Sequence, residues 1–111
     1  MVWQEARELA VEIYRITDLE PFNRDYSFRD QIRRAAISIP SNIAEGDESG
    51  FIKLSIRYFH NAKASLSELE TQIEIAMKTN FIKKTDSDTI DTAMDQLSRK
   101  LRRLIQLRQS L

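Results

Sequence analysis

The sequence predicts an all-α protein, an antiparallel up-down-up-down four-helix bundle that forms one domain over residues 1–111. Three observations predict this fold class. Apolar residues recur at alternating spacings of three and four in four separate segments, which is the period of an amphipathic helix. Gly and Pro occur only twice each, so long helices run uninterrupted. The loops between the segments are roughly five to eight residues long, a length that favours antiparallel neighbours.

The first helix is expected over residues 2–17. At about 100° per residue, its apolar side chains fall on one broad side. They are Trp3, Ala6, Leu9, Ala10, Ile13, Tyr14 and Ile16. The stretch LEPFNRD ends the helix, because Pro21 has no N–H to continue it.

The second helix, expected over residues 26–46, has three kinds of surface. Its core stripe comprises Phe28, Ile32, Ala35, Ala36, Ile39 and Ile43. Its polar stripe comprises Gln31, Arg34, Ser38, Ser41, Asn42 and Glu45, and a second apolar strip comprises Ile37, Pro40 and Ala44. A surface helix of a monomer needs only one apolar face. The pattern therefore predicts contact on two sides, with its own bundle and with something else.

Pro40 stands inside this second helix, with three short polar side chains around it. Proline removes the backbone hydrogen bond to the carbonyl of Ala36 and bends the helix. Ser38, Ser41 and Asn42 can satisfy the freed carbonyl or hydrogen-bond to a neighbouring helix. We therefore expect a kinked, polar helix at a packed junction. The alternative is that these small residues only ease local helix packing.

The third helix, expected over residues 50–79, carries the strongest periodicity. Its seam is Ile52, Ser55, Phe59, Ala62, Leu66, Leu69, Ile73 and Ala76. Such a seam is typical of helices that cross at a shallow angle. Ser49 is its expected N-cap and Asn80 its expected left-handed stop. The fourth helix is expected over residues 86–109, with Thr85 as its cap.

A second polar stripe lies beside the seam of the third helix, at Asn61, Ser65, Glu68 and Gln72. In an antiparallel hairpin Arg34 lies within about one turn of Glu68. We therefore expect an Arg34–Glu68 ion pair, within one chain or between chains. The predicted interface network consists of Gln31, Arg34, Ser38, Pro40, Ser41, Asn42, Glu45, Ser65 and Glu68.

Helix length favours self-association. At 1.5 Å per residue the third helix spans about 45 Å and the first only about 24 Å. Part of the third helix, including Leu54, Ile56 and Tyr58, then lacks cover from its own chain. Exposed apolar surface of that kind marks interfaces. The chain is therefore expected to form a homo-oligomer.

Composition argues against an enzyme. The single histidine, His60, is expected in solvent and excludes a di-iron site, and the Glu70–Glu74 pair is expected on an exposed face where nothing raises either pKa. No phosphate-binding loop or nucleophile–histidine–acid set occurs, so we expect no catalytic residue, metal, cofactor or small-molecule substrate. There is no cysteine, no secretion signal and no apolar run of about 18 residues. We therefore expect a cytoplasmic protein that does not enter membranes.

Charge is balanced overall, with 17 basic and 17 acidic residues, so no global field attracts nucleic acid. One basic cluster remains, formed by Arg99, Lys100, Arg102 and Arg103. It is either an ordinary solvated face or, multiplied in an oligomer, a weak, sequence-independent site for phosphate backbones.

The stretches DQIRRAAISIPSNIAEG and AKASLSELETQIEIA, together with the opening VWQEARELAVEIYRIT, resemble the bacterial proteins encoded in intervening sequences of 23S ribosomal RNA genes. The resemblance covers nearly the whole chain. It implies a four-helix bundle that assembles as a homopentameric ring. It also implies kinship with the accessory variability determinant of diversity-generating retroelements, a strongly basic relative, whereas this chain is neutral.

These observations favour a non-enzymatic, ring-forming structural or interaction module. Two alternatives remain open. One is a weak nucleic-acid (rRNA or DNA) binding protein that uses Arg99, Lys100, Arg102 and Arg103. The other is an adaptor that docks a protein partner, such as a reverse transcriptase or a ribosomal component.

Overall fold

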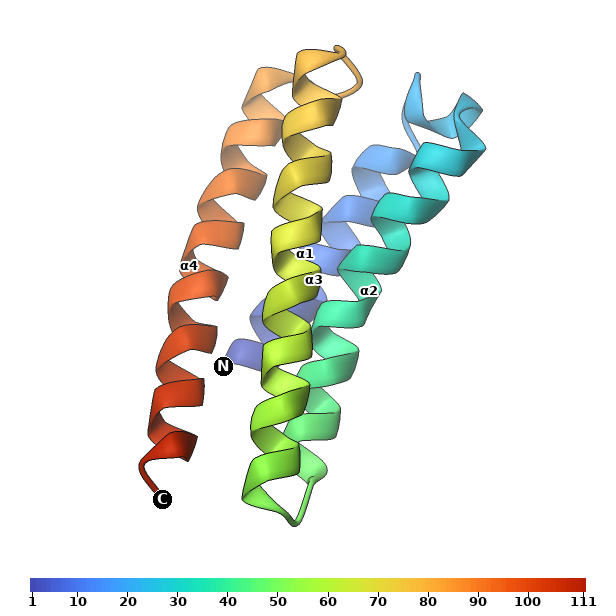
Figure 1. Ribbon diagram of the computed structural model, residues 1–111. Helices are drawn as coiled ribbons and strands as arrows, with labels where there is room; N and C mark the ends of the chain where they lie inside the picture. Colours follow the sequence, from blue (N-terminus) through green and yellow to red (C-terminus); the bar gives the residue numbers. More distant parts are fainter.

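The computed structural model describes residues 1–111 and contains four long helices and one short 3₁₀ helix (Figure 1). They are α1 (Val2–Thr17), η1 (Phe22–Arg24), α2 (Tyr26–Glu48), α3 (Ile52–Lys78) and α4 (Lys84–Gln109). Successive helices are antiparallel, and α1 and α3 each pack against both α2 and α4. The all-α four-helix bundle predicted from the sequence is therefore confirmed. The bounds of α1 match the expectation, and those of the other helices shift by about two residues.

Two predicted helix caps are wrong. Ser49 ends α2, and α3 begins after Phe51 without a side-chain cap. Thr85 lies inside α4, which begins after Lys83. Asp25 is the only residue whose side chain caps a helix, accepting a hydrogen bond from the backbone N–H of Phe28 at 3.0 Å. Ser and Thr cap a helix only when the preceding loop holds them in the non-helical conformation, which local sequence does not decide.

The predicted stop of α3 at Asn80 is confirmed. Asn80 has a φ of 62°, in the left-handed region that asparagine tolerates. The N–H of Phe81 donates to the carbonyl of Ala76 at 2.7 Å, and the N–H of Asn80 donates to that of Met77 at 3.1 Å. This pair of hydrogen bonds is the Schellman arrangement, which satisfies carbonyls at the end of a helix.

The core lies along the axis of the bundle and comprises 23 buried apolar residues. The predicted core stripe of α2 and the predicted seam of α3 supply much of it, together with Ile90, Met94, Leu97, Leu101 and Ile105 of α4. Phe28 is only partly buried, and one seam residue is exposed. Ile52 is 45% exposed, because it lies in the first turn of α3 where no neighbouring helix covers it. At the end of the bundle that contains η1, called the upper end below, the rings of Phe22, Phe28 and Phe81 pack together with centroids 5.2–5.5 Å apart.

The short α1 covers only part of the bundle. It has 16 residues against 27 in α3, and its N-terminus lies beside the middle of α4 (Figure 1). Lys100 on α4 contacts Glu5 in the first turn of α1, and α4 continues for nine residues beyond that point. The opposite, lower end of the bundle therefore consists of three helices, as the expected difference in helix length implies.

Candidate functional site

A small polar network joins α2 to α3 at the centre of the predicted interface. The hydroxyls of Ser38 and Ser65 lie 2.8 Å apart. The Asn42 side-chain amide donates to the Ser38 carbonyl at 2.8 Å and to its hydroxyl at 3.0 Å. All three side chains are half-buried. Two roles were expected for the short side chains around Pro40. The structure contains one of them, the hydrogen bond between Ser38 on α2 and Ser65 on α3. It lacks the other, because no side chain donates to the carbonyl of Ala36.

The other polar members of the predicted network lie around this centre and face water. Gln31, Arg34, Ser41, Glu45 and Glu68 are exposed and make no side-chain hydrogen bond within the chain. Arg34 and Glu68 form no ion pair with each other. The within-chain version of that prediction is therefore wrong. Both side chains are exposed to water. An ion pair between solvated side chains contributes little to stability, so nothing holds the two together.

A second surface lies between α1 and α2 and is called the α1–α2 face. It comprises Trp3, Arg7, Tyr14, Arg33, Ile37, Pro40 and Ala44. Trp3, Tyr14 and Ile37 are 37%, 38% and 44% exposed. Trp3 and Tyr14, which the sequence pattern assigns to the core side of the first helix, therefore lie at its rim.

Arginines hold the aromatic rings of this face in place. The guanidinium of Arg7 lies 5.0 Å from the ring centroid of Trp3, and that of Arg33 lies 4.4 Å from the ring of Tyr14. Arg33 also donates to the hydroxyl of Thr17 at 2.7 Å and to the carboxylate of Asp18 at 2.8 Å. The face is thus pre-ordered, with aromatic and aliphatic surface in contact with water.

The structure divides the predicted basic cluster on α4. Lys100 turns towards α1 and forms an ion pair with Glu5 at 2.5 Å. Arg99 forms an ion pair with Asp95 at 3.1 Å, one turn along the helix. Arg102 and Arg103 are exposed and form no ion pair, but they point about 100° apart around α4. The four residues therefore do not form one continuous positive surface.

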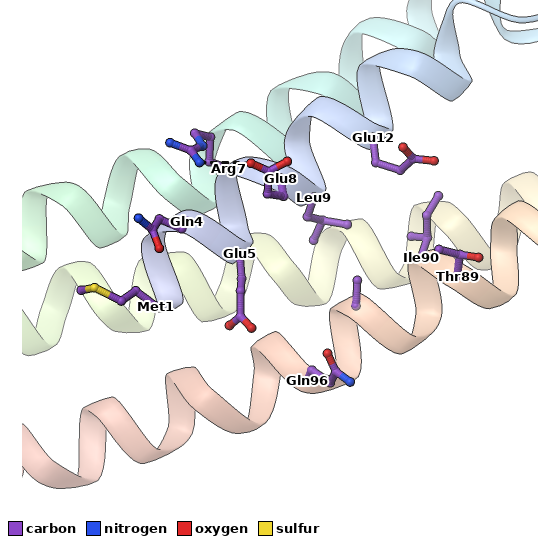
Figure 2. A pocket seen from close by; sticks show the side chains of 11 residues that line it. Met1, Gln4, Glu5, Arg7, Glu8, Leu9, Glu12, Thr89, Ile90 and Gln96 are labelled. Carbon is purple, nitrogen blue, oxygen red and sulfur yellow. Dashed lines mark hydrogen bonds and ion pairs between the residues drawn. The ribbon is translucent and has the colours of Figure 1, made fainter.

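A groove of about 670 Å³ lies between α1 and α4. Leu9 and Ile90 point into the space between the helices, and Glu5, Glu8 and Glu12 leave α1 around it (Figure 2). Each of these carboxylates already has a cationic partner, which is Lys100, Arg7 and Arg15 respectively. No group of His, Asp and Glu side chains has an arrangement suited to a metal ion. The three acids around the groove are thus engaged by basic side chains, while Oε2 of Glu5 is buried without a hydrogen-bond partner.

Glu70 corrects one prediction about the carboxylates of α3. Partial burial, followed by the nearby charges of Asp95 and Asp91, raises the pKa of Glu70 above its ordinary value. The sequence pattern places Glu70 and Glu74 on an open face, and both are exposed. The pattern of α3 alone does not reveal that α4 brings Asp91 and Asp95 close to Glu70.

A cluster at the lower end includes residues that the sequence did not single out. The hydroxyl of Ser55 donates to the carbonyl of Gly46 at 2.7 Å, and Arg108 donates to the same hydroxyl at 3.1 Å. The Arg108 guanidinium lies 5.5 Å from the ring centroid of Phe59 and 3.9 Å from a carboxylate oxygen of Asp47. Arg108 therefore covers part of the core beyond the end of α1. The one feature of the sequence that pointed to this cluster was Ser55, a polar residue at a seam position of α3.

Comparison with known protein families shows to which family the chain belongs. The family model described as 23S rRNA-intervening sequence protein matches residues 1–103. The chain belongs to the 23S rRNA-intervening sequence protein family. The resemblance seen in the sequence is therefore confirmed, and no curated protein matches the chain.

A solved structure supports the fold of this family member. It is the 1.70 Å crystal structure of a protein of unknown function from the S23 ribosomal protein family of Bacteroides thetaiotaomicron. The two structures superpose with a TM-score of 0.87 at 23% identity, over 95% of this chain and 98% of the other. The similarity extends over the whole bundle. No helix of the chain has both the length and the apolarity needed to cross a bilayer.

Proposed function

We propose that this 23S rRNA-intervening sequence protein is a non-enzymatic, self-associating module whose copies bind one another through the α1–α2 face. One observation carries the proposal: Trp3, Tyr14 and Ile37 are each more than a third exposed on one pre-ordered surface. Contiguous exposed apolar surface is uncommon on monomers and marks interaction sites. A second copy is the partner that every solution of the protein supplies.

The composition of the α1–α2 face supports this role. Trp, Tyr and Arg are the residue types that dominate binding energy at interfaces. Stacking of Arg7 on Trp3 and of Arg33 on Tyr14 restricts these side chains before binding, which lowers the entropy lost on association. The side chains of Pro40 and Ala44 on this side of α2 are small, so another helix can approach the backbone of α2 closely. A chain with no net charge also does not repel its own copies at long range.

A closed ring is the form of assembly that we propose. The family resemblance implies five copies, and an odd-numbered ring requires a heterologous contact, in which the α1–α2 face of one copy binds a different surface of the next. The Ser38–Asn42–Ser65 network supports such a ring by tying α2, which carries part of the contact, to α3. The absence of an enzymatic role remains part of the proposal.

The experiment is light scattering coupled to size exclusion at micromolar concentration. The wild-type chain is expected at a multiple of 13.0 kDa, and Ile37→Glu is expected to dissociate it. Ile75→Glu is the matched control, because Ile75 is an equally exposed isoleucine (47% against 44%) on the outer surface of α3. A folded wild-type monomer, or an Ile37→Glu variant with unchanged mass, would rule out the proposal.

Nucleic-acid binding is the second candidate, and it is supported by Arg102 and Arg103, which have no ion partner within the chain. A salt-dependent mobility shift with structured RNA and duplex DNA tests it. Loss of that shift in Arg102→Glu, Arg103→Glu would support binding by these residues. No shift at low salt would exclude it. If neither self-association nor nucleic-acid binding is found, co-purification from the host tests an adaptor role.

A further inference from the structure

We propose that the outer surface between α3 and α4, called the α3–α4 face, binds a second copy of the chain in an antiparallel, two-fold symmetric contact. In this contact α3 lies against α3 of the other copy and α4 against α4. The contact goes beyond the proposed ring, since it uses a different face and joins copies in pairs.

The upper half of the α3–α4 face is acidic. Glu70, Glu74 and Asp91 line a cavity of about 510 Å³ between the two helices, and none of them forms an ion pair. The raised pKa of Glu70 agrees with this geometry, because burial and the nearby acids oppose its ionised form. Lys78 lines the same cavity without pairing to any of the acids. This half of the face therefore carries negative charge that the chain does not neutralise.

The lower half of the same face is basic. Lys63 lies on the α4 side of α3, on the same face as Glu70 two turns later, and Arg102 lies on the α3 side of α4. Neither side chain forms an ion pair, and Arg102 is exposed. The exposed His60 lies a turn below Lys63. The face therefore has opposite charges at its two ends.

The positions of these charges match a two-fold axis through the centre of the face. The Met77–Ser87 and Ser55–Arg108 hydrogen bonds define the antiparallel register of α3 and α4, and this register places Ser67 within a turn of Ser98. On α3, Glu70 lies about 4.5 Å above this centre and Lys63 about 6 Å below it. Rotation by 180° about an axis that runs across the helices brings each opposite the other.

The same operation pairs the charges of α4 and the ends of α3. Asp95 and Asp91 precede Ser98 by one and two turns, and Arg102 follows it by one turn, so Arg102 of each copy faces acids of the other. Met77, which is 38% exposed near the upper end, comes opposite the half-buried Ile56 near the lower end. Opposite charges thus surround the centre and apolar side chains meet beyond them.

The size and shape of the face suit such a dimer. The bundle measures 46 × 22 × 19 Å, so one long face offers a footprint of roughly 1,000 Å², against the about 800 Å² per partner of a standard interface. Ser67 and Ser98 at its centre are small and let the helices approach. Because the contact depends on ion pairs near water, it should weaken as salt rises.

Two charge-reversal variants test the proposal. Glu70→Lys, Asp91→Lys leaves Glu74 and Asp95 in place but gives both halves of the face a net positive charge, and Lys63→Glu, Arg102→Glu gives both halves a net negative charge. Each variant alone should repel its own copies and show half of the wild-type mass in sedimentation at low salt. An equimolar mixture of the two should regain the wild-type mass, because each basic face then meets an acidic one.

The control is Lys83→Glu, Arg103→Glu, which changes the net charge as much as Lys63→Glu, Arg102→Glu but lies outside the face; its mass should equal that of the wild type. Circular dichroism establishes that every variant is folded. The proposal is overturned if the wild-type mass does not fall by half in high salt, if either variant keeps that mass, or if the mixture fails to associate. Failure of the ring proposal gives a different result. In that case Ile37→Glu leaves the wild-type mass unchanged, whereas the charge-reversal variants still halve it.

Discussion

The ring of Phe59 occupies the space that a side chain at Gly46 would need. A Cβ atom at position 46 would lie 2.7 Å from Cδ1 of Phe59, closer than real Cβ contacts. Gly46 lies in the last turn of α2 and Phe59 in the second turn of α3, and both are buried. Only glycine at this position lets the two helices meet closely enough for Ser55 to reach the Gly46 carbonyl.

Gly46→Ala is therefore expected to destabilise the protein by about 1–3 kcal/mol, the usual cost of overpacking a core. Elsewhere in a helix the same change stabilises by about 1 kcal/mol. The sign should therefore reverse in a Phe59→Leu background, where the clash is removed. Urea unfolding measures both effects. Gly50→Ala is the control, because nothing lies within 4 Å of its Cβ, and an equal loss there would contradict the explanation.

Arg108→Gln is expected to lower the free energy of unfolding by about 1–2 kcal/mol, because it removes a charged hydrogen bond to Ser55 and a cation–π contact with Phe59. Arg103→Gln, which changes an arginine of the same helix that has no ion partner, should stay within about 0.5 kcal/mol of the wild type. Denaturant titration compares the two. Equal stability of both variants would mean that Arg108 contributes nothing at the lower end.

The Ser38–Ser65 contact is expected to show a coupling of about 0.5–1.5 kcal/mol in a double-mutant cycle of Ser38→Ala and Ser65→Ala. The hydroxyls are half-buried, so each single change leaves a partner with less hydrogen bonding. Thermal or urea unfolding of the four proteins gives the coupling. Purely additive effects would show that the hydrogen bond between α2 and α3 adds no stability.

Glu70→Gln is expected to stabilise the folded chain at neutral pH but not in acid. The folded-state pKa of Glu70 is raised by burial and by Asp95 and Asp91. Protonated Glu70 therefore contributes favourably to the free energy of unfolding, and this contribution is complete below the ordinary glutamate pKa. That contribution is lost as the pH rises through the raised value. The advantage of the variant in free energy of unfolding should therefore grow across this window, measured at one fixed high salt concentration at which the proposed pairing of copies is not expected. A constant difference at every pH would contradict it.

Local sequence predicted the helices well but not their ends. Spacings of three and four placed α1 to α4 within about two residues, because burial of one face forces that period. Asn80 was correctly assigned, since few residues other than glycine tolerate a positive φ. Ser49 and Thr85 were not, because many residues can cap a helix and the loop decides which one does.

The polar contacts at the candidate interface were predicted only in part. The polar stripes of α2 and α3 pointed to Ser38, Asn42 and Ser65, since register alone brings them together in an antiparallel hairpin. The same stripe wrongly paired Arg34 with Glu68 within the chain, because helical geometry sets which residues are neighbours but not whether exposed side chains bond. The division of the basic cluster by Lys100 required knowing that Glu5 lies beside it.

By itself the sequence determined the family, the four helices and the core face of each, because these depend on residues close together in the chain. Tertiary structure decided everything that needs two distant segments at once. It placed Phe59 against Gly46, Arg108 over the lower end, and two acids of α4 beside Glu70. The physical reason is that contact energies fall off within a few ångströms, and separation along the chain does not reveal which helices come that close.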